Sequence, residues 1–233
     1  MNENKKNIEA IYELSPMQQG MLFHTIFDEN NENYFEQLSV TLNGELDIKA
    51  FEKSWQSVIE RHSVFRTSFA YKNIERMLQV VHKKVSLPFS YLDWTKKSNY
   101  EKEIEYEQLL TKDRKQSFNL NIAPLLRIIL IKFDENKCKL IWSHHHILLD
   151  GWSLPIVFSE LFKIYESIKL NKQIYLPAVH SYQNFIKHLK AKSKEEADSF
   201  WQKYFQGFSE KTPLIIDKGN LDTREDLNSK DNG

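Results

Sequence analysis

The chain of 233 residues has little of several features that mark particular classes of protein. Its single cysteine, Cys138, excludes an internal disulfide framework and is typical of a reducing compartment. No apolar run approaches the ~18 residues of a membrane-spanning helix, and the first residues lack the apolar core of a signal peptide. These absences predict a soluble, cytoplasmic protein.

The chain also lacks an excess of charge and is poor in glycine and proline. Thirty-two Lys and Arg balance 32 Asp and Glu, so electrostatics give no reason to expect nucleic-acid binding. Only six of the basic residues are arginines, and two of these, Arg61 and Arg66, fall in one short stretch. Glycine and proline number six each, less than half of the usual share of about 12%. No flexible linker or repeat is visible, and 41% hydrophobic residues predict a packed core.

Helical and strand periods alternate along the chain, which predicts an α/β or α+β fold with a mixed sheet. Ser15, Pro16 and Gln18 match the N-cap, first position and capping box of a helix. Alternating or continuous apolar residues predict strands at 38–42, 64–69, 77–81, 125–133 and 139–144, with a turn at 134–136. Helical spacing predicts helices at 48–59, 100–117, 152–168 and between 182 and 207, and the polar residues 218–233 are expected to be frayed.

Three consecutive histidines close the strand predicted at 139–144, and Asp150 follows before a turn that Gly151 can close. Strand alternation places His144 and His146 on one face and His145 on the other. Three interpretations stay open. In the first, the histidines form a buried, hydrogen-bonded cluster. In the second, His144, His146 and Asp150 bind a metal, although no second His/Cys group has matching spacing. In the third, one histidine is a catalytic base or positioning group.

Three segments together resemble the motifs of condensation domains of nonribosomal peptide synthetases. Residues 145–151 read HHxxxDG, the signature of that family, and the flanking residues 142–153 match it as well. Leu14 to His24 (LSPMQQGMLFH) resembles the first motif, and Arg61 to Phe69 (RHSVFRTSF) resembles the second. The segments occur in the expected order, and the resemblance covers roughly residues 11–215.

The resemblance implies a chloramphenicol acetyltransferase-like lobe, an α/β (α+β) two-layer sandwich with a mixed sheet. Residues 1–176 would form this N-terminal lobe, and residues 177–233 would contain helices that begin a second lobe and a disordered polar tail. A complete condensation domain is about twice as long as this chain, so the second lobe is expected to be missing or only begun. The surface that would contact that lobe is expected to be apolar.

The resemblance also implies an activity. Donor and acceptor carrier proteins would bring thioesters on 4'-phosphopantetheine arms, and the acceptor amine would attack the donor carbonyl to form an amide. No directly bound cofactor and no metal are implied. The expected partners are the two peptidyl carrier proteins and an adenylation domain or the missing second lobe of the same synthetase, with no nucleic acid and no membrane.

Carried over to this chain, the motifs assign roles to single residues. His146 would be catalytic, either as a base or by positioning the amine, and His145 would be structural. Asp150 would hold the loop by pairing with Arg61 or Arg66, and Gly151 would provide close backbone approach or an amide that faces the carbonyl. Weaker candidates for contact with substrate are Trp152 and Ser153.

Two alternatives are weighed against this function. The first is a single-lobed acyltransferase of the HxxxD type that uses coenzyme A, which the segments LSPMQQGMLFH and RHSVFRTSF disfavour. The second is a non-catalytic remnant that docks carrier proteins without chemistry. Acyl-CoA-dependent transfer would indicate the first, and carrier binding without turnover would indicate the second.

Overall fold

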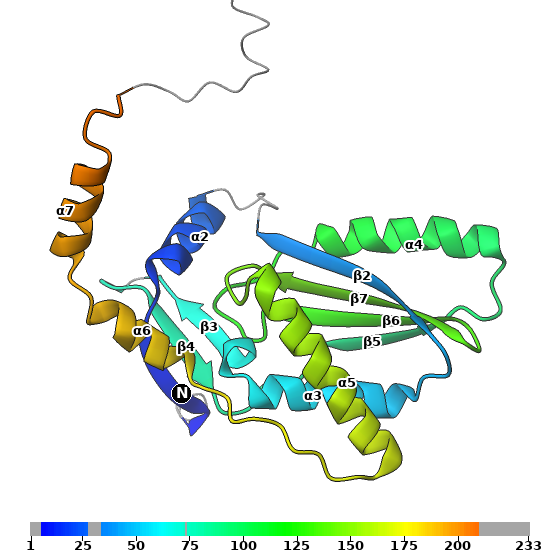
Figure 1. The fold of residues 1–233 in the computed structure, drawn as a ribbon. Helices are drawn as coiled ribbons and strands as arrows, with labels where there is room; N and C mark the ends of the chain where they lie inside the picture. Colours follow the sequence, from blue (N-terminus) through cyan, green and yellow to red (C-terminus); the bar gives the residue numbers. More distant parts are fainter. Residues whose placement is uncertain (1–5, 28–33, 73, 210–233) are drawn as a thin grey trace, which may run out of the picture. The chain divides into compact units, whose positions relative to one another are not determined.

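The computed structural model describes residues 6–27, 34–72 and 74–209, which fall into two compact units that divide after Leu189. The first unit holds two β-sheets (Figure 1). The smaller sheet has the order β1-β4-β3, and its strands are Ile8–Glu13, Leu78–His82 and Thr67–Ala70. The larger has the order β2-β7-β6-β5, and its strands are Phe35–Asn43, Lys137–His145, Leu126–Asp134 and Phe89–Asp93. Only β5 and β6 run parallel, so the larger sheet is mixed, as predicted.

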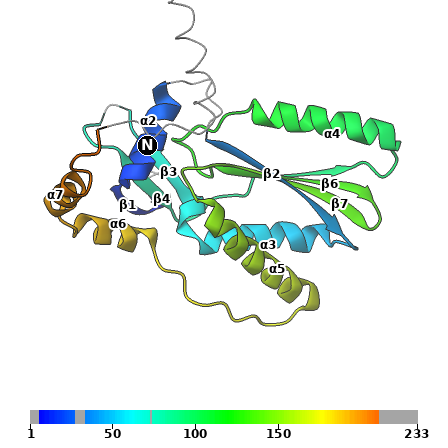
Figure 2. The same cartoon turned by 45° about the horizontal axis from the view of Figure 1, so that its top comes forward.

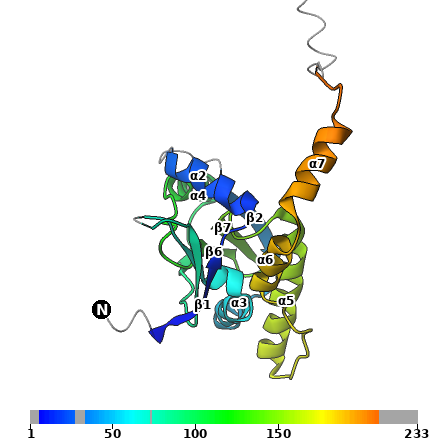
Figure 3. The ribbon, with the colours of Figure 1, turned by 90° about the vertical axis from the view of Figure 1, so that its left-hand side faces the viewer.

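Helices cover both faces of the larger sheet. Helices α3 (Ile48–Arg61) and α5 (Leu154–Leu170) lie side by side on one face (Figure 1 and Figure 3), and α4 (Asn99–Arg114) lies on the other (Figure 2). Trp142 of β7 is fully buried under the first pair, with its ring 5.0 Å from that of Trp55 and 5.6 Å from that of Phe158. The neighbouring Ile141 is buried in a second cluster, which includes Tyr106 of α4. Strand β7 is therefore covered on both faces.

Local signals read from the sequence determine where several elements begin. The predicted capping box starts α2 (Pro16–Phe27): Ser15 Oγ accepts from the Gln18 amide at 3.2 Å, and Gln18 Oε1 accepts from the Ser15 amide at 3.0 Å. Asp47 caps α3 by accepting from the Ala50 amide at 2.9 Å. The hairpin predicted at 134–136 joins the antiparallel strands β6 and β7.

Two predicted boundaries were wrong. The segment predicted as a strand at 64–69 begins with a 3₁₀ turn at Ser63–Arg66, and β3 starts only at Thr67. The Thr67 hydroxyl donates to the Ser63 carbonyl at 2.8 Å, a local bond that competes with strand pairing. The helix predicted to start at Trp152 starts at Leu154, because Gly151–Ser153 form a second 3₁₀ turn. A short apolar run does not distinguish such a turn from a strand or helix.

The C-terminal helices predicted between 182 and 207 are present. Helix α6 (Tyr182–Lys190) buries Ile186. In the second unit, α7 (Lys194–Tyr204) is capped by Ser193, which accepts from the Glu196 amide at 3.1 Å. The domain boundary predicted at 176/177 stays a prediction, and residues 218–233 lie outside the described part of the chain. No helix in the described ranges has the length and apolar character needed to cross a bilayer.

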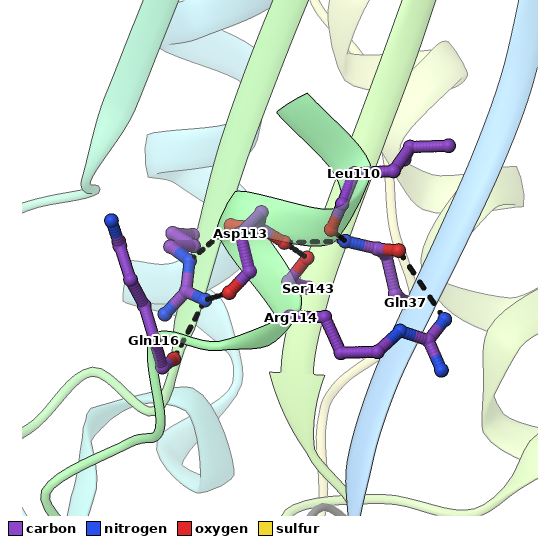
Figure 4. Close-up of polar contacts among 7 residues, drawn as sticks. Gln37, Leu110, Asp113, Arg114, Gln116 and Ser143 are labelled. Carbon is purple, nitrogen blue, oxygen red and sulfur yellow. Dashed lines mark hydrogen bonds and ion pairs between the residues drawn. The ribbon is translucent and has the colours of Figure 1, made fainter. Parts of the chain in front are cut away.

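A buried carboxylate fastens the end of α4 to the larger sheet (Figure 4). Asp113 accepts from Arg127 Nε of β6 at 2.5 Å, from Gln37 Nε2 of β2 at 2.7 Å and from the Ser143 hydroxyl of β7. Arg127 also donates to the carbonyls of Asp113 and Gln116 at 2.6 and 2.8 Å. One side chain thus links a helix to three strands, and its charge is balanced by a guanidinium.

We expect Asp113→Ala to lower the free energy of unfolding by roughly 3–5 kcal/mol, because it leaves Arg127 largely buried without its carboxylate. Urea unfolding followed by tryptophan fluorescence measures the change. Glu135→Ala is the matched control: it removes an exposed ion pair with Lys132 and should leave the free energy of unfolding almost unchanged. Similar small losses in both variants would contradict a stabilising role for the Asp113 network.

Candidate functional site

The histidine motif lies where β7 ends and α5 begins. His145 is the last residue of β7, and residues 146–150 form the loop that leads to the Gly151–Ser153 turn. Three backbone bonds hold this loop. The amides of His145 and His146 donate to the carbonyls of Leu125 and Tyr34 at 3.0 and 2.8 Å, and the Leu148 amide donates to the His145 carbonyl at 3.1 Å.

Two of the three histidines are buried in different surroundings. His144 packs on the Trp142 ring at 4.9 Å, and its Nδ1 has no hydrogen-bond partner among the described residues. His145 accepts the Ile147 amide on Nδ1 at 3.1 Å, and its Nε2 lies 3.2 Å from the hydroxyl of Thr25. The Thr25 hydroxyl donates to a backbone carbonyl of α2, so the Nε2–H of His145 is the donor in that contact. His145 is thus a neutral imidazole that supports the loop.

Electrostatics agree with this geometry. Burial, with a smaller contribution from the neighbouring histidines, lowers the pKa of His144 to about 4. Burial, with a smaller contribution from the neighbouring His146, lowers the pKa of His145 to about 4 as well. Both rings are therefore neutral near pH 7.

His146 is the accessible histidine of the motif. Its side chain is 34% exposed, and its Nδ1 lies 3.8 Å from Glu36 Oε1 on β2. The side chain lines a cavity of about 380 Å³, which we call the His146 cavity. This cavity is formed by α2, the motif loop and α6, and its lining includes Met17, Gln18, His146, Asp150, Tyr182 and Phe185.

The adjacent His145 lines a different cavity of about 630 Å³, the His145 cavity. Three cationic side chains, Lys72, Arg114 and Lys115, contribute to its lining. Consecutive residues of one motif thus line two separate hollows. Of the weaker candidates, Ser153 lines the His146 cavity, whereas Trp152 is 87% exposed and lines neither hollow.

The predicted ion pair of Asp150 with Arg61 or Arg66 was wrong. Asp150 instead caps the turn that follows it: its Oδ1 accepts from the amide and the hydroxyl of Ser153 at 3.0 and 2.8 Å. It makes no ion pair within the described part of the chain. The reason is that both arginines are taken by other carboxylates, so Asp150 shapes the loop through hydrogen bonds alone.

Arg61 and His62 bind Glu160, a residue that the sequence motifs did not single out. Arg61 Nε and Nη2 donate to the two carboxylate oxygens at 2.9 and 3.3 Å, and His62 Nε2 lies 2.7 Å from Oε2. Arg61 also donates to the Pro177 carbonyl. A signal for Glu160 was present, because it is a charged residue within the apolar stripe of a predicted helix. The second motif therefore anchors α5, the helix that begins directly after the histidine loop.

Arg66 binds two strands of the smaller sheet. Its side chain is buried, and it donates to Glu9 of β1 at 2.6 Å and to the His82 carbonyl of β4. Within the described ranges, no three side chains of His, Cys, Asp or Glu come together in a way that could hold a metal. The set of His144, His146 and Asp150 considered from the sequence is thus not assembled.

Comparison with known proteins gives consistent results. A family model described as "Condensation domain" matches residues 8–230. Bacitracin synthase 3 of Bacillus licheniformis is 38% identical over 96% of the chain, and tyrocidine synthase 2 of Brevibacillus parabrevis is 36% identical over 91%. The chain spans only 4% and 6% of these two proteins.

Solved structures show the same fold. A mutant of the starter condensation domain of rhizomide synthetase matches with a TM-score of 0.78 at 17% identity, over 87% of this chain and 49% of that one. The first condensation domain of the calcium-dependent antibiotic synthetase matches with a TM-score of 0.74 at 15% identity, over 88% and 50%. The predicted fold class is confirmed, and the chain spans about half the length of these structures.

The buried histidines predict that stability depends on pH. Between pH 6.5 and about 4, His144 and His145 are protonated in the unfolded chain but neutral in the folded chain. The free energy of unfolding should therefore fall as the pH falls through this range. Urea unfolding at pH 7, 6 and 5 measures the slope. His144→Gln should make it shallower, and His180→Gln, which changes an exposed histidine, should not. Equal slopes in the wild type, His144→Gln and His180→Gln would contradict a lowered pKa of His144 as a cause of the pH dependence.

The anchor on α5 predicts a second pH effect. Burial opposes ionisation of Glu160, but hydrogen bonds from Arg61 and His62 outweigh it and lower the pKa of Glu160 below its ordinary 4.5. The stabilisation is therefore complete above pH 4.5 and is lost as the pH falls below it. Glu160→Gln should cost roughly 1.5–3 kcal/mol at pH 7.

Unfolding measured from pH 7 to pH 3 tests this, with Glu52→Gln on the exposed face of α3 as the control. The difference between the wild type and Glu160→Gln should shrink below pH 4.5, whereas Glu52→Gln should match the wild type throughout. If the difference in the free energy of unfolding between the wild type and Glu160→Gln stays constant down to pH 3, Glu160 is not an ionised partner of Arg61 and His62.

Proposed function

The chain belongs to the condensation-domain family, and from that premise we propose that it supplies the His146 side of an amide-forming active site in a nonribosomal peptide synthetase. The substrates are a donor aminoacyl or peptidyl thioester and an acceptor aminoacyl thioester, each carried on the 4'-phosphopantetheine of a carrier protein. The observation that supports this most is that, of the three histidines, His146 alone is partly exposed, and that it lines a cavity of about 380 Å³.

The reaction is acyl transfer. The acceptor amine attacks the donor carbonyl, the new C–N bond forms, the C–S bond breaks, and the proton lost by the amine ends on the leaving sulfur. His146 is the group beside the amine, where it accepts that proton or orients the amine for attack. His145 contributes by holding the loop as a neutral ring.

The two cavities suit two substrates. Because His146 and His145 are consecutive but line separate hollows, reactants can reach the motif from different sides. The cations Lys72, Arg114 and Lys115 in the lining of the His145 cavity suit the phosphate of a phosphopantetheine arm. Ser153 is the better placed of the two weak substrate-binding candidates, because it lines the His146 cavity.

A second half of the domain completes the site in this proposal. The chain spans about half of the solved condensation domains that it resembles, and α2 exposes Phe23 and Phe27 beside the described site. Exposed aromatic surface of this kind is typical of a contact that another segment covers. The proposed partners are the two carrier proteins and an adenylation domain or this second half of the same synthetase.

The test supplies a second half. The full chain is mixed with the second half of a related condensation domain and two loaded carrier proteins, and dipeptidyl thioester is measured by mass spectrometry. His146→Ala should lower the rate by roughly 10²–10⁴-fold, the contribution of a general base. His180→Ala, which changes an exposed histidine outside both cavities, should leave the rate unchanged.

Other outcomes would replace the proposal. Product formation that His146→Ala does not affect would reject His146 as the catalytic residue. Transfer from an acyl-CoA without carrier proteins would indicate the single-lobed acyltransferase. Carrier binding with no product after the second half is supplied would indicate a docking remnant.

A further inference from the structure

A buried glutamine of α2 contacts the histidine loop from outside it. Gln18 belongs to the LSPMQQGMLFH segment and is only 5% exposed. Its Nε2 donates to the carbonyl of Ile147, the residue after His146, at 3.3 Å. The chain distance between the two partners is 129 residues, so this is a tertiary contact between the first and third motifs.

A second buried glutamine fixes the direction of this amide. Gln79 of β4 is 1% exposed and donates to Gln18 Oε1 at 2.8 Å, while Gln18 Nε2 lies 3.3 Å from Gln79 Oε1. Gln79 also donates to the Glu13 carbonyl, and Gln18 Oε1 accepts from the Ser15 amide at 3.0 Å. With its oxygen engaged by two donors, the nitrogen of Gln18 must face the loop.

Three contacts then fix the backbone around His146. The His146 amide donates to the Tyr34 carbonyl, the Ile147 amide donates to His145 Nδ1, and the Ile147 carbonyl accepts from Gln18. The first two come from the sheet side of the loop, and the third comes from α2. The Ile147 carbonyl shares its peptide with the Leu148 amide, which donates to the His145 carbonyl. Without Gln18, this peptide loses one of its two hydrogen bonds, and the loop that carries His146 is held less firmly.

We infer that Gln18, oriented by Gln79, is a positioning residue for the His146 loop. It touches no reacting atom in this inference; it acts by holding the peptide that joins Ile147 to Leu148, so that the loop keeps the His146 ring in its place in the cavity. The effect of Gln18 on catalysis rests on the proposed function, but its effect on the protection of the loop amides can be measured without any turnover.

Hydrogen exchange on the full chain is the first test. Gln18→Met keeps the length of the side chain but removes both polar atoms. The amides of His146, Ile147 and Leu148 should exchange about tenfold faster, the factor that corresponds to one lost hydrogen bond. Amides of α3 and β6 should keep their wild-type rates. If Gln18→Met does not fold, Gln18→Asn, which keeps the amide but is one methylene shorter, takes its place.

Gln19→Met is the matched control. Gln19 is the next residue of the same helix, is exposed, and its side-chain amide donates to the Leu14 carbonyl at 3.4 Å. Its variant should leave the loop amides unchanged. Unchanged loop exchange in Gln18→Met, or equal acceleration of loop and core amides, would overturn the inference.

The second test uses the complemented assay described above, with rates expressed per folded protein. Gln18→Met should lower kcat about tenfold and change KM for the carrier-bound substrates much less, because a positioning residue acts on the placement of His146 more than on substrate binding. Faster loop exchange with an unchanged kcat, in an assay that His146→Ala abolishes, would overturn the positioning role. If His146→Ala has no effect, the proposed function fails, and the exchange data still decide whether Gln18 holds the loop.

Discussion

The burial of β7 on both faces is the constraint on which the site depends. Trp142 is enclosed by aromatic side chains of α3 and α5, and Ile141 is enclosed under α4. A strand packed in this way has no freedom to slip, since a shift of one residue would exchange its two buried faces. The histidine motif continues directly from this strand, so the position of His145 and the start of the loop are set by packing.

Polar contacts then bind the surrounding elements to that strand. Asp113 joins α4 to three strands of the larger sheet, and Glu160 holds α5 against α3. Gln18 joins α2 to the loop. In each case a polar side chain with little exposure has its hydrogen bonds satisfied by residues far away in the sequence, which favours one arrangement of the elements over others. The three motifs of the family therefore describe one structural unit, in which the second motif supports α5 and the first supports the loop.

Burial also divides the three histidines by chemistry. His144 and His145 lie in the interior and remain neutral, and the hydrogen bonds of His145 need it neutral. His146 follows one residue later, beyond the end of the strand, and is the one that reaches the smaller cavity beside α2 and α6. The change from strand to loop at this point explains why adjacent residues of the same type have different surroundings, and why consecutive residues line separate hollows.

The sequence alone determined the local features and the family. Capping groups at Ser15 and Asp47, the hairpin after β6 and the alternating strands are signals between near neighbours, so they can be read without a fold, and the motif order identifies the condensation domain. Tertiary structure alone decided the partners. The sequence contains 32 acidic residues that could pair with Arg61. Its pairing with Glu160, 99 residues away, depends on how α3 packs against α5. The contact of Gln18 with Ile147, 129 residues away, was decided in the same way, because the distance between groups far apart in the chain is set only when the helices and sheets have packed.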